Sequence, residues 1–348
     1  MASKQFSIGY FGSQQRFYQK IRELSVSEQY IDVTAGGGGV PYRLLSEKSA
    51  SKVVTNDLSF YSYICSKTVL EGTQISEEEL LAIVEVEDKT NYLSSKDSGI
   101  RHGFFNAPLR KFIDGYCIKH KDFPLALAAL GKTLLYDCTF RGLAFCKKLA
   151  NKQRMEDVTV PEFKEMILKH LRYFNKKILE KTESKAFNSN ANDFVMNFNE
   201  FEGTTVYTDP AWPFNPKLGY SVGENPYLYS SEIIPSILLQ SDLVLKLPWN
   251  TRDLFTKDRS EKVDYSVFLP ELKNKILSDV FLWIDISFEK GAKQFIINTQ
   301  STNFPIPEEL NQELRDRYPK ISYSEAIYNG IGRKNRQFSE FWWSITNQ

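Results

Sequence analysis

The sequence is poor in the residues that metal and disulfide chemistry require. It has three histidines, none of them in an HxxxH arrangement, so we expect no histidine-rich metal site. The cysteine spacing matches neither a zinc ribbon nor a CxxC redox pair, which predicts reduced thiols in an intracellular protein. The four cysteines are Cys65, Cys117, Cys138 and Cys146.

Long apolar runs are also lacking. No stretch approaches the roughly 18 apolar residues that a membrane-spanning helix needs. The amino-terminal segment MASKQFSIGYFG has no apolar core followed by a small-residue cleavage site. We therefore expect no membrane span, no secretory signal and a cytoplasmic location.

The chain of 348 residues is long enough for two domains, or for one domain with a large insertion. Its net charge is only +1, but the charge is unevenly distributed, because residues 101–181 contain 17 Lys/Arg and 8 Asp/Glu. A concentrated basic surface is typical of a protein that binds a polyanion, although a solvated set of helix surfaces has the same composition.

The order of predicted elements indicates an α/β fold. The first segments read as helix, strand, glycine loop, helix and strand, which is the βαβ order of a parallel sheet; they cover residues 16–24, 30–33, 34–41, 42–47 and 52–55. From about residue 75 to 181 the apolar spacing becomes helical. Strand patterns resume after the Asn-rich junction 188–193, at residues 205–208, 243–247, 294–298, 321–327 and 341–346. We predict a discontinuous sheet domain, residues 1–74 and 200–348, interrupted by a mostly helical insertion, residues 75–199.

The segment YIDVTAGGGGVPYRLL passes from a strand through four glycines into a helix. Glycines there allow a tight turn and a close approach of the backbone to a ligand. Asp57 follows the next strand, where an acid can accept hydrogen bonds from ribose hydroxyls, so the pattern predicts an adenosine-containing ligand. A GxGxxG dinucleotide motif would need a third glycine where Pro41 or Tyr42 stands, and no Walker A lysine is present. Asp32, just before the glycines, favours a ligand with a cationic amino group over a pyrophosphate.

The segment TVYTDPAWPF, residues 204–213, ends a strand in an acid and a proline. Asp-Pro is a common turn, but the carboxyl end of a strand is also where α/β proteins place ligands. Together with the glycine loop, DPAW resembles the (D/N/S)PP(Y/F/W) loop of amino-group DNA methyltransferases. The order of glycine loop, large insertion and DPAW resembles the Dam-like class of DNA adenine methyltransferases.

Further stretches resemble the same class. IGYFGSQQRFYQKI is similar to its amino-terminal cofactor motif, and VVTNDLSFYSYI is similar to its ribose segment. SGIRHGFFNAPLRKFIDGYCIKH resembles the start of the target-recognition insertion, and SEAIYNGIGRKNRQFSEFWWSITN resembles the closing basic hairpin.

This resemblance implies a Rossmann-like, S-adenosylmethionine-dependent enzyme that flips adenine out of double-stranded DNA and methylates its N6 amino group, with no metal. The implied catalytic residues are Asp209, Pro210 and Trp212: the carboxylate and the Pro210 carbonyl would accept the amine hydrogens, and the indole would stack on the flipped base. The implied cofactor residues are Tyr10, Phe11, Gly12, Asp32, Ala35, Gly36, Gly38, Asp57 and Asp209. The implied substrate residues are Ala211, Tyr220, Tyr227, Arg333, Lys334 and Arg336.

Two positions depart from the family pattern. Gln14 stands where the amino-terminal motif usually has lysine, and Ala211 stands where the catalytic loop usually has a second proline. These departures leave open a catalytically silent nucleic-acid-binding module, and the shared chemistry leaves open cytosine-N4 or RNA substrates. A nucleotide-dependent oxidoreductase is disfavoured by the glycine spacing. The DNA recognition sequence, a restriction or defence-system partner and the oligomeric state do not follow from this sequence.

Overall fold

The computed structural model describes residues 18–95, 104–139, 154–179, 182–210, 232–243, 265–301, 307–329 and 337–347. Their core is a seven-stranded sheet with the order β3-β2-β1-β4-β5-β7-β6. The strands are β1 (Gln29–Asp32), β2 (Lys52–Asn56), β3 (Lys185–Phe187), β4 (Thr205–Thr208), β5 (Gln294–Gln300), β6 (Ile321–Asn329) and β7 (Gln337–Thr346). Five strands run parallel, and β7 is antiparallel to both of its neighbours, β5 and β6.

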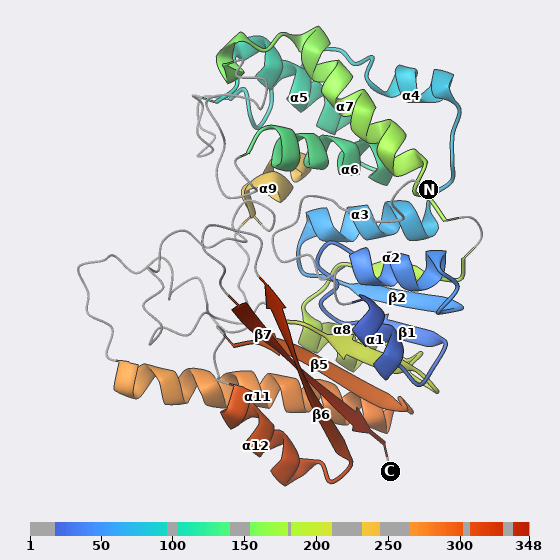
Figure 1. The fold of residues 1–348 in the computed structure, drawn as a ribbon. Coiled ribbons are helices and arrows are strands. Elements are labelled where there is room, and N and C mark those ends of the chain that lie inside the picture. Colours follow the sequence, from blue (N-terminus) through green and yellow to red (C-terminus); the bar gives the residue numbers. More distant parts are fainter. Residues whose placement is uncertain are drawn as a thin grey trace.

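Helices cover both faces of this sheet (Figure 1). On one face, α1 (Tyr18–Leu24) and α2 (Gly39–Ser46) pack against side chains of β1, β2, β4, β5 and β7. On the other face lie α8 (Ala191–Asn197), α11 (Tyr265–Glu289) and α12 (Pro307–Arg317). Burial on both faces explains why β4 reads as the nearly unbroken strand-forming run TVYT.

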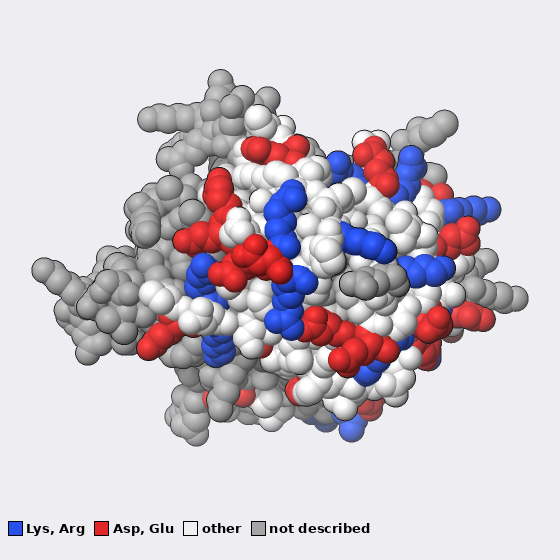
Figure 2. Space-filling view, turned by 90° about the horizontal axis from the view of Figure 1, so that it is seen from below, with Lys and Arg blue, Asp and Glu red and all other residues white. Residues whose placement is uncertain are grey.

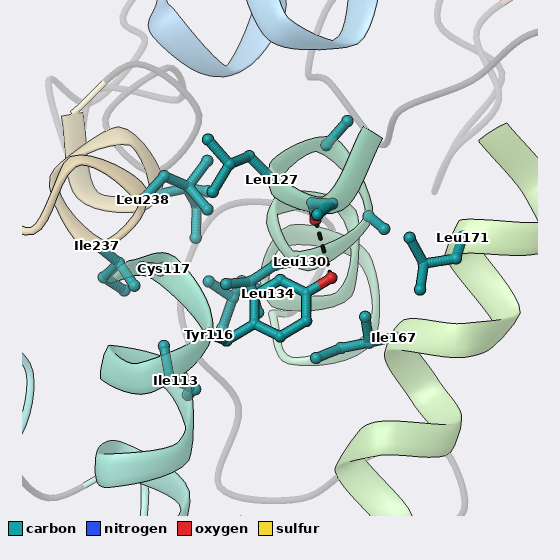
Figure 3. Packing of buried hydrophobic residues seen from close by; sticks show 14 of the residues in the cluster. Ile113, Tyr116, Cys117, Leu127, Leu130, Leu134, Ile167, Leu171, Ile237 and Leu238 are labelled. Carbon is teal, nitrogen blue, oxygen red and sulfur yellow. Dashed lines mark hydrogen bonds between the residues drawn. The ribbon is translucent and has the colours of Figure 1, made fainter. Parts of the chain in front are cut away.

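A second, helical layer packs on α3 (Phe60–Glu71), which contacts β2 and β3. The layer contains α4 (Glu77–Ile83), α5 (Ala107–Lys119), α6 (Pro124–Lys132), the π-helical turn η2 (Thr133–Asp137), the 3-10 turn η3 (Met155–Asp157), α7 (Val160–Asn175) and α9 (Ile234–Leu239). Figure 3 shows its centre, where side chains of α5, α6, α7 and α9 meet. The helical layer therefore shares one core with α3, which packs on the sheet.

The helix α9 follows the DPAW segment in the chain but packs with the insertion. Ile237 and Leu238 are buried against α5 and α6 (Figure 3). Just beyond α9, the Tyr92 hydroxyl donates to Asp242 Oδ1 at 2.5 Å. The segment of residues 234–242 is thus attached to the helical layer.

The return from the insertion to the sheet comes earlier than expected. β3 pairs in parallel with β2, although its residues lie within the predicted insertion of residues 75–199. The three residues of β3, Lys-Ala-Phe, are too few to show a strand pattern in the sequence. The Asn-rich junction begins α8: the Asn190 side chain accepts from the Asn192 N–H at 2.9 Å.

Apart from the segment 243–247, the other predicted strands agree with the structure to within a few residues. The parallel pairing of β1 and β2 is confirmed, as are β4, β5, β6 and β7. The predicted hairpin is confirmed by antiparallel pairing of β6 with β7, although its basic loop lies outside the described residues. The predicted strand at 243–247 is not supported at Leu243, and residues 244–247 also lie outside them.

Histidines and cysteines in the described part of the chain have structural surroundings. His120 is hydrogen-bonded to the Ile83 carbonyl at 2.8 Å, and His170 to Asp137 at 2.6 Å. Cys65, Cys117 and Cys138 are buried thiols that form no disulfide among the described residues. None of the helices described is long and apolar enough to cross a membrane.

Charge is mixed on the face seen from below in Figure 2, where basic and acidic side chains lie side by side. Ion pairs join Lys273 to Glu313 at 3.2 Å, Lys52 to Glu200 at 2.6 Å, and Arg317 to Asp285. The described residues of this face form no patch of a single sign.

Candidate active site

The carboxyl ends of β1, β2 and β4 meet at one edge of the sheet. β1 lies between β2 and β4, so the strand order changes direction there. In open α/β sheets, ligands bind outside the strand ends at this switch point. Asp32 ends β1, and the loops after β2 and β4 carry Asp57 and Asp209, so acids from distant parts of the sequence come together.

The loop after β1 turns into α2 through glycines. Gly36 and Gly38 have φ angles of 52° and 65°, in the left-handed region that favours glycine. Gly38 caps α2 without a side-chain hydrogen bond, so a ligand can approach backbone atoms there. Pro41, the third residue of α2, lacks an N–H, which removes one of the donors that a pyrophosphate uses at a helix N-terminus.

Asp57 fastens this glycine loop to the end of β2. Its Oδ2 accepts from the Gly36 N–H at 2.7 Å, and its Oδ1 accepts from the Ser59 N–H at 2.8 Å. Burial raises the pKa of Asp57 to about 7, against the opposing effect of these two N–H groups. Each carboxylate oxygen can accept more than one hydrogen bond, so Asp57 can still receive hydroxyl donors.

Asp32 lies at the end of β1 and is 2% exposed. Its Oδ1 accepts from the Thr34 N–H at 3.3 Å. Burial raises the pKa of Asp32 well above its usual value; the Thr34 N–H lowers it, and the nearby Asp57 charge raises it further.

Thr34 joins the glycine loop to the catalytic candidate Asp209. Its Oγ1 accepts from the Asp209 backbone N–H at 3.1 Å and lies 3.0 Å from Thr208 Oγ1. Backbone pairing continues just below, where the Val33 N–H donates to the Tyr207 carbonyl at 3.0 Å. The two loops are therefore in direct contact.

Sequence reasoning missed Thr34 and two asparagines. The Asn56 amide, 1% exposed, donates to the Val33 and Ser189 carbonyls, each at 3.1 Å. Asn188 donates to the carbonyls of Asp57 and Leu58 at 2.8 and 3.0 Å. Asn56 could have been found from the sequence, because it stands next to the candidate Asp57 in the segment TNDLSF. No local pattern in the sequence indicates Thr34 or Asn188.

The predicted site residues that the structure describes all lie at this edge: Asp32, Ala35, Gly36, Gly38, Asp57, Asp209 and Pro210. The Ala35 N–H donates to the Asn56 carbonyl at 2.9 Å, and Pro210 is buried beside the partly buried Asp209. The other predicted residues lie outside the described part of the chain: Tyr10, Phe11, Gly12, Ala211, Trp212, Tyr220, Tyr227, Arg333, Lys334 and Arg336, as does Gln14.

The described residues contain no cluster of three or more His, Cys, Asp or Glu that could hold a metal ion.

The sheet and its helical insertion define a Rossmann-like methyltransferase fold. Residues 10–219, more than half of the chain, match the family of D12 class N6 adenine-specific DNA methyltransferases, and the chain belongs to this family. It is an adenine-specific DNA methyltransferase, which needs a methyl donor and acts on the N6 amino group of adenine in DNA. No curated protein matches the chain.

Proposed function

We propose that the methyl donor is S-adenosylmethionine and that it binds at the edge formed by the loops after β1, β2 and β4. Asp57 accepts from the ribose hydroxyls, and Asp32 faces the cationic amino-acid end. Support comes from the chemistry of these residues: two acids flank a glycine turn without a Cβ, and Pro41 weakens the alternative of a pyrophosphate. Tyr10, Phe11, Gly12, Ala35, Gly36 and Gly38 complete the proposed donor site.

When bound, the donor supplies a methyl group already activated by the sulfonium charge. The chain's own residues then have to hold the adenine amine in line with that methyl. Asp209 accepts one amine hydrogen through its carboxylate, and Pro210 accepts the other through its carbonyl. These bonds draw nitrogen toward tetrahedral geometry and release its lone pair, which is otherwise delocalised into the ring. The Thr34 bridge to the Asp209 N–H supports this placement, because it fixes the backbone that carries both acceptors.

The proposed substrate is double-stranded DNA, from which the target adenine is flipped. Flipping requires a few kcal/mol, and stacking on Trp212 returns about 1–3 kcal/mol. Ala211, Tyr220 and Tyr227 are proposed to line the base pocket, and Arg333, Lys334 and Arg336 to contact phosphates. The helical insertion is proposed as the target-recognition part, because it holds the basic excess of residues 101–181. We place the enzyme in the cytoplasm, where such DNA is accessible.

The observation that carries the proposal is the direct contact between the glycine loop and Asp209 through Thr34. The test is the Asp209→Ala variant, with Asp122→Ala as control, because the Asp122 side chain is 88% exposed. We expect Asp209→Ala to abolish methyl transfer and to leave calorimetric binding of S-adenosylmethionine nearly unchanged. Equal loss of both would show that Asp209 belongs to the donor site alone.

Identification of the product separates the remaining alternatives. Duplex DNA treated with the wild-type protein is digested to nucleosides and weighed by mass spectrometry. N6-methyladenine supports the proposal, whereas N4-methylcytosine would redefine the target base; a parallel reaction with RNA tests the RNA alternative. Donor binding without any methylated nucleoside would indicate a silent nucleic-acid-binding module.

A further inference from the structure

Two buried tyrosines lie beneath the proposed catalytic edge. Tyr30 lies in β1, two residues before Asp32. Tyr207 lies in β4, two residues before Asp209, which directly follows the end of the strand. Because side chains alternate along a strand, each tyrosine lies on the same sheet face as the acid that follows it. This is the face covered by α1 and α2, and the tyrosines are 1% and 2% exposed.

The hydroxyl groups of both tyrosines are buried and have no hydrogen-bond partner within the described part of the chain. A buried hydroxyl without a partner is unfavourable, so most such groups in native proteins are paired. The rings are held in a stacked row: Tyr30 and Tyr207 have centroids 6.1 Å apart, and Tyr207 and Trp342 have centroids 6.3 Å apart. The rings cannot swing away to find a partner, so a partner has to come to them.

The charges around each hydroxyl differ. Burial raises the pKa of Tyr207, and the charge of Asp209 raises it further, followed by Asp32 and Glu340. Burial likewise raises the pKa of Tyr30, and the charge of Asp32 and then Tyr207 raise it further. The charge of Asp209 thus acts on the Tyr207 hydroxyl, whereas the Tyr30 hydroxyl is affected by Asp32 and Tyr207.

Polar groups from the neighbouring strands complete these surroundings. Glu340 of β7, 0% exposed, accepts from the Asn298 amide of β5 at 3.2 Å. Thr34 from the glycine loop holds the Asp209 N–H. A phenolic O–H is a donor that a carboxylate accepts.

We propose that Tyr207 is a positioning residue whose hydroxyl donates to the Asp209 carboxylate when that carboxylate engages the adenine amine. One carboxylate oxygen then accepts from the amine, and the other is held by Tyr207. The bond fixes the carboxylate plane and stabilises its ionised form. The inference rests on the proposed role of Asp209.

The test is Tyr207→Phe, which keeps the stacked ring and deletes the hydroxyl alone. Tyr30→Phe is the matched control, because Tyr30 is equally buried, its ring stacks on Tyr207, and its hydroxyl also has no hydrogen-bond partner among the described residues. The single-turnover rate of methyl transfer is measured across pH for both variants, together with donor affinity and the thermal unfolding midpoint of the donor-free protein.

For Tyr207→Phe we expect a rate about tenfold lower, an acid limb of the pH profile moved to higher pH by about one unit, and unchanged donor affinity. The unfolding midpoint should stay equal or rise, because an unpartnered buried hydroxyl is removed. Tyr30→Phe should keep the wild-type rate and acid limb.

Three results would overturn the inference. Tyr207→Phe could keep the wild-type rate and acid limb, Tyr30→Phe could slow transfer equally, or Tyr207→Phe could lower the unfolding midpoint in proportion to its loss of rate. Failure of the proposed function is distinguishable, because Asp209→Ala would then retain methyl transfer.

Discussion

Replacing Thr34 with valine removes the oxygen that accepts the Asp209 N–H and keeps nearly the same side-chain shape. Two interactions of Thr34 Oγ1 are lost: the hydrogen bond that it accepts from the Asp209 N–H at 3.1 Å, and its contact with Thr208 Oγ1 at 3.0 Å. The Thr34 backbone N–H, which donates to Asp32, is unaffected. The substitution therefore acts on the anchor of the catalytic strand and leaves the donor-binding acids in place.

The expected magnitude follows from the partly buried N–H that loses its acceptor. A buried N–H without an acceptor is unfavourable by about 1–3 kcal/mol. Each 1.36 kcal/mol added to the activation free energy of methyl transfer lowers the rate by a factor of about ten. If most of this free energy is expressed in the transition state, the rate falls between about 5-fold and 150-fold. Thr34→Ser, which keeps the hydroxyl, should stay within about threefold of wild type.

The assay is single-turnover transfer of a labelled methyl group to duplex DNA, because product release limits the steady state of many enzymes. Donor affinity is measured in parallel by calorimetry and should change less than the rate does. A valine variant that transfers at the wild-type rate would refute the anchoring role. A serine variant as slow as valine would assign the effect to packing.

Two further predictions concern the donor site and the stability of the sheet. Ribose hydroxyls that donate to Asp57 favour its ionised form, so its pKa of about 7 predicts that donor affinity falls as pH drops from 8 to 6. Calorimetry should show this dependence in wild type and weaker, flatter binding in Asp57→Asn; an unchanged slope would assign the titration to Asp32, whose pKa is also raised. Lys290 Nζ donates to the carbonyls of Val195, Met196 and Phe198 at 2.9, 2.6 and 2.7 Å at the end of α8. Lys290→Met should lower the free energy of unfolding in urea by about 1–2 kcal/mol, whereas Lys275→Met at an exposed position of α11 should not; equal effects would mean that the carbonyl contacts add nothing.

The glycine loop and the catalytic segment illustrate what local sequence determines. Gly36 and Gly38 have positive φ angles, which favour glycine. β4 reads as a strand because its four residues are strand formers buried on both faces. Their order along the chain carried the family resemblance, which the match over residues 10–219 confirms. These signals are local, so they are readable without a structure.

Contacts between distant segments were decided by the tertiary structure. Thr34 and Asp209 are 175 positions apart, and Asn188 lies 131 positions from Asp57. β3 is too short to show a period, and it becomes a strand because β2 offers it backbone partners. The unpartnered hydroxyls of Tyr30 and Tyr207 likewise follow from packing against α1 and α2. A sequence specifies which groups can donate or accept, but parallel pairing of strands far apart in the chain selects which of them meet.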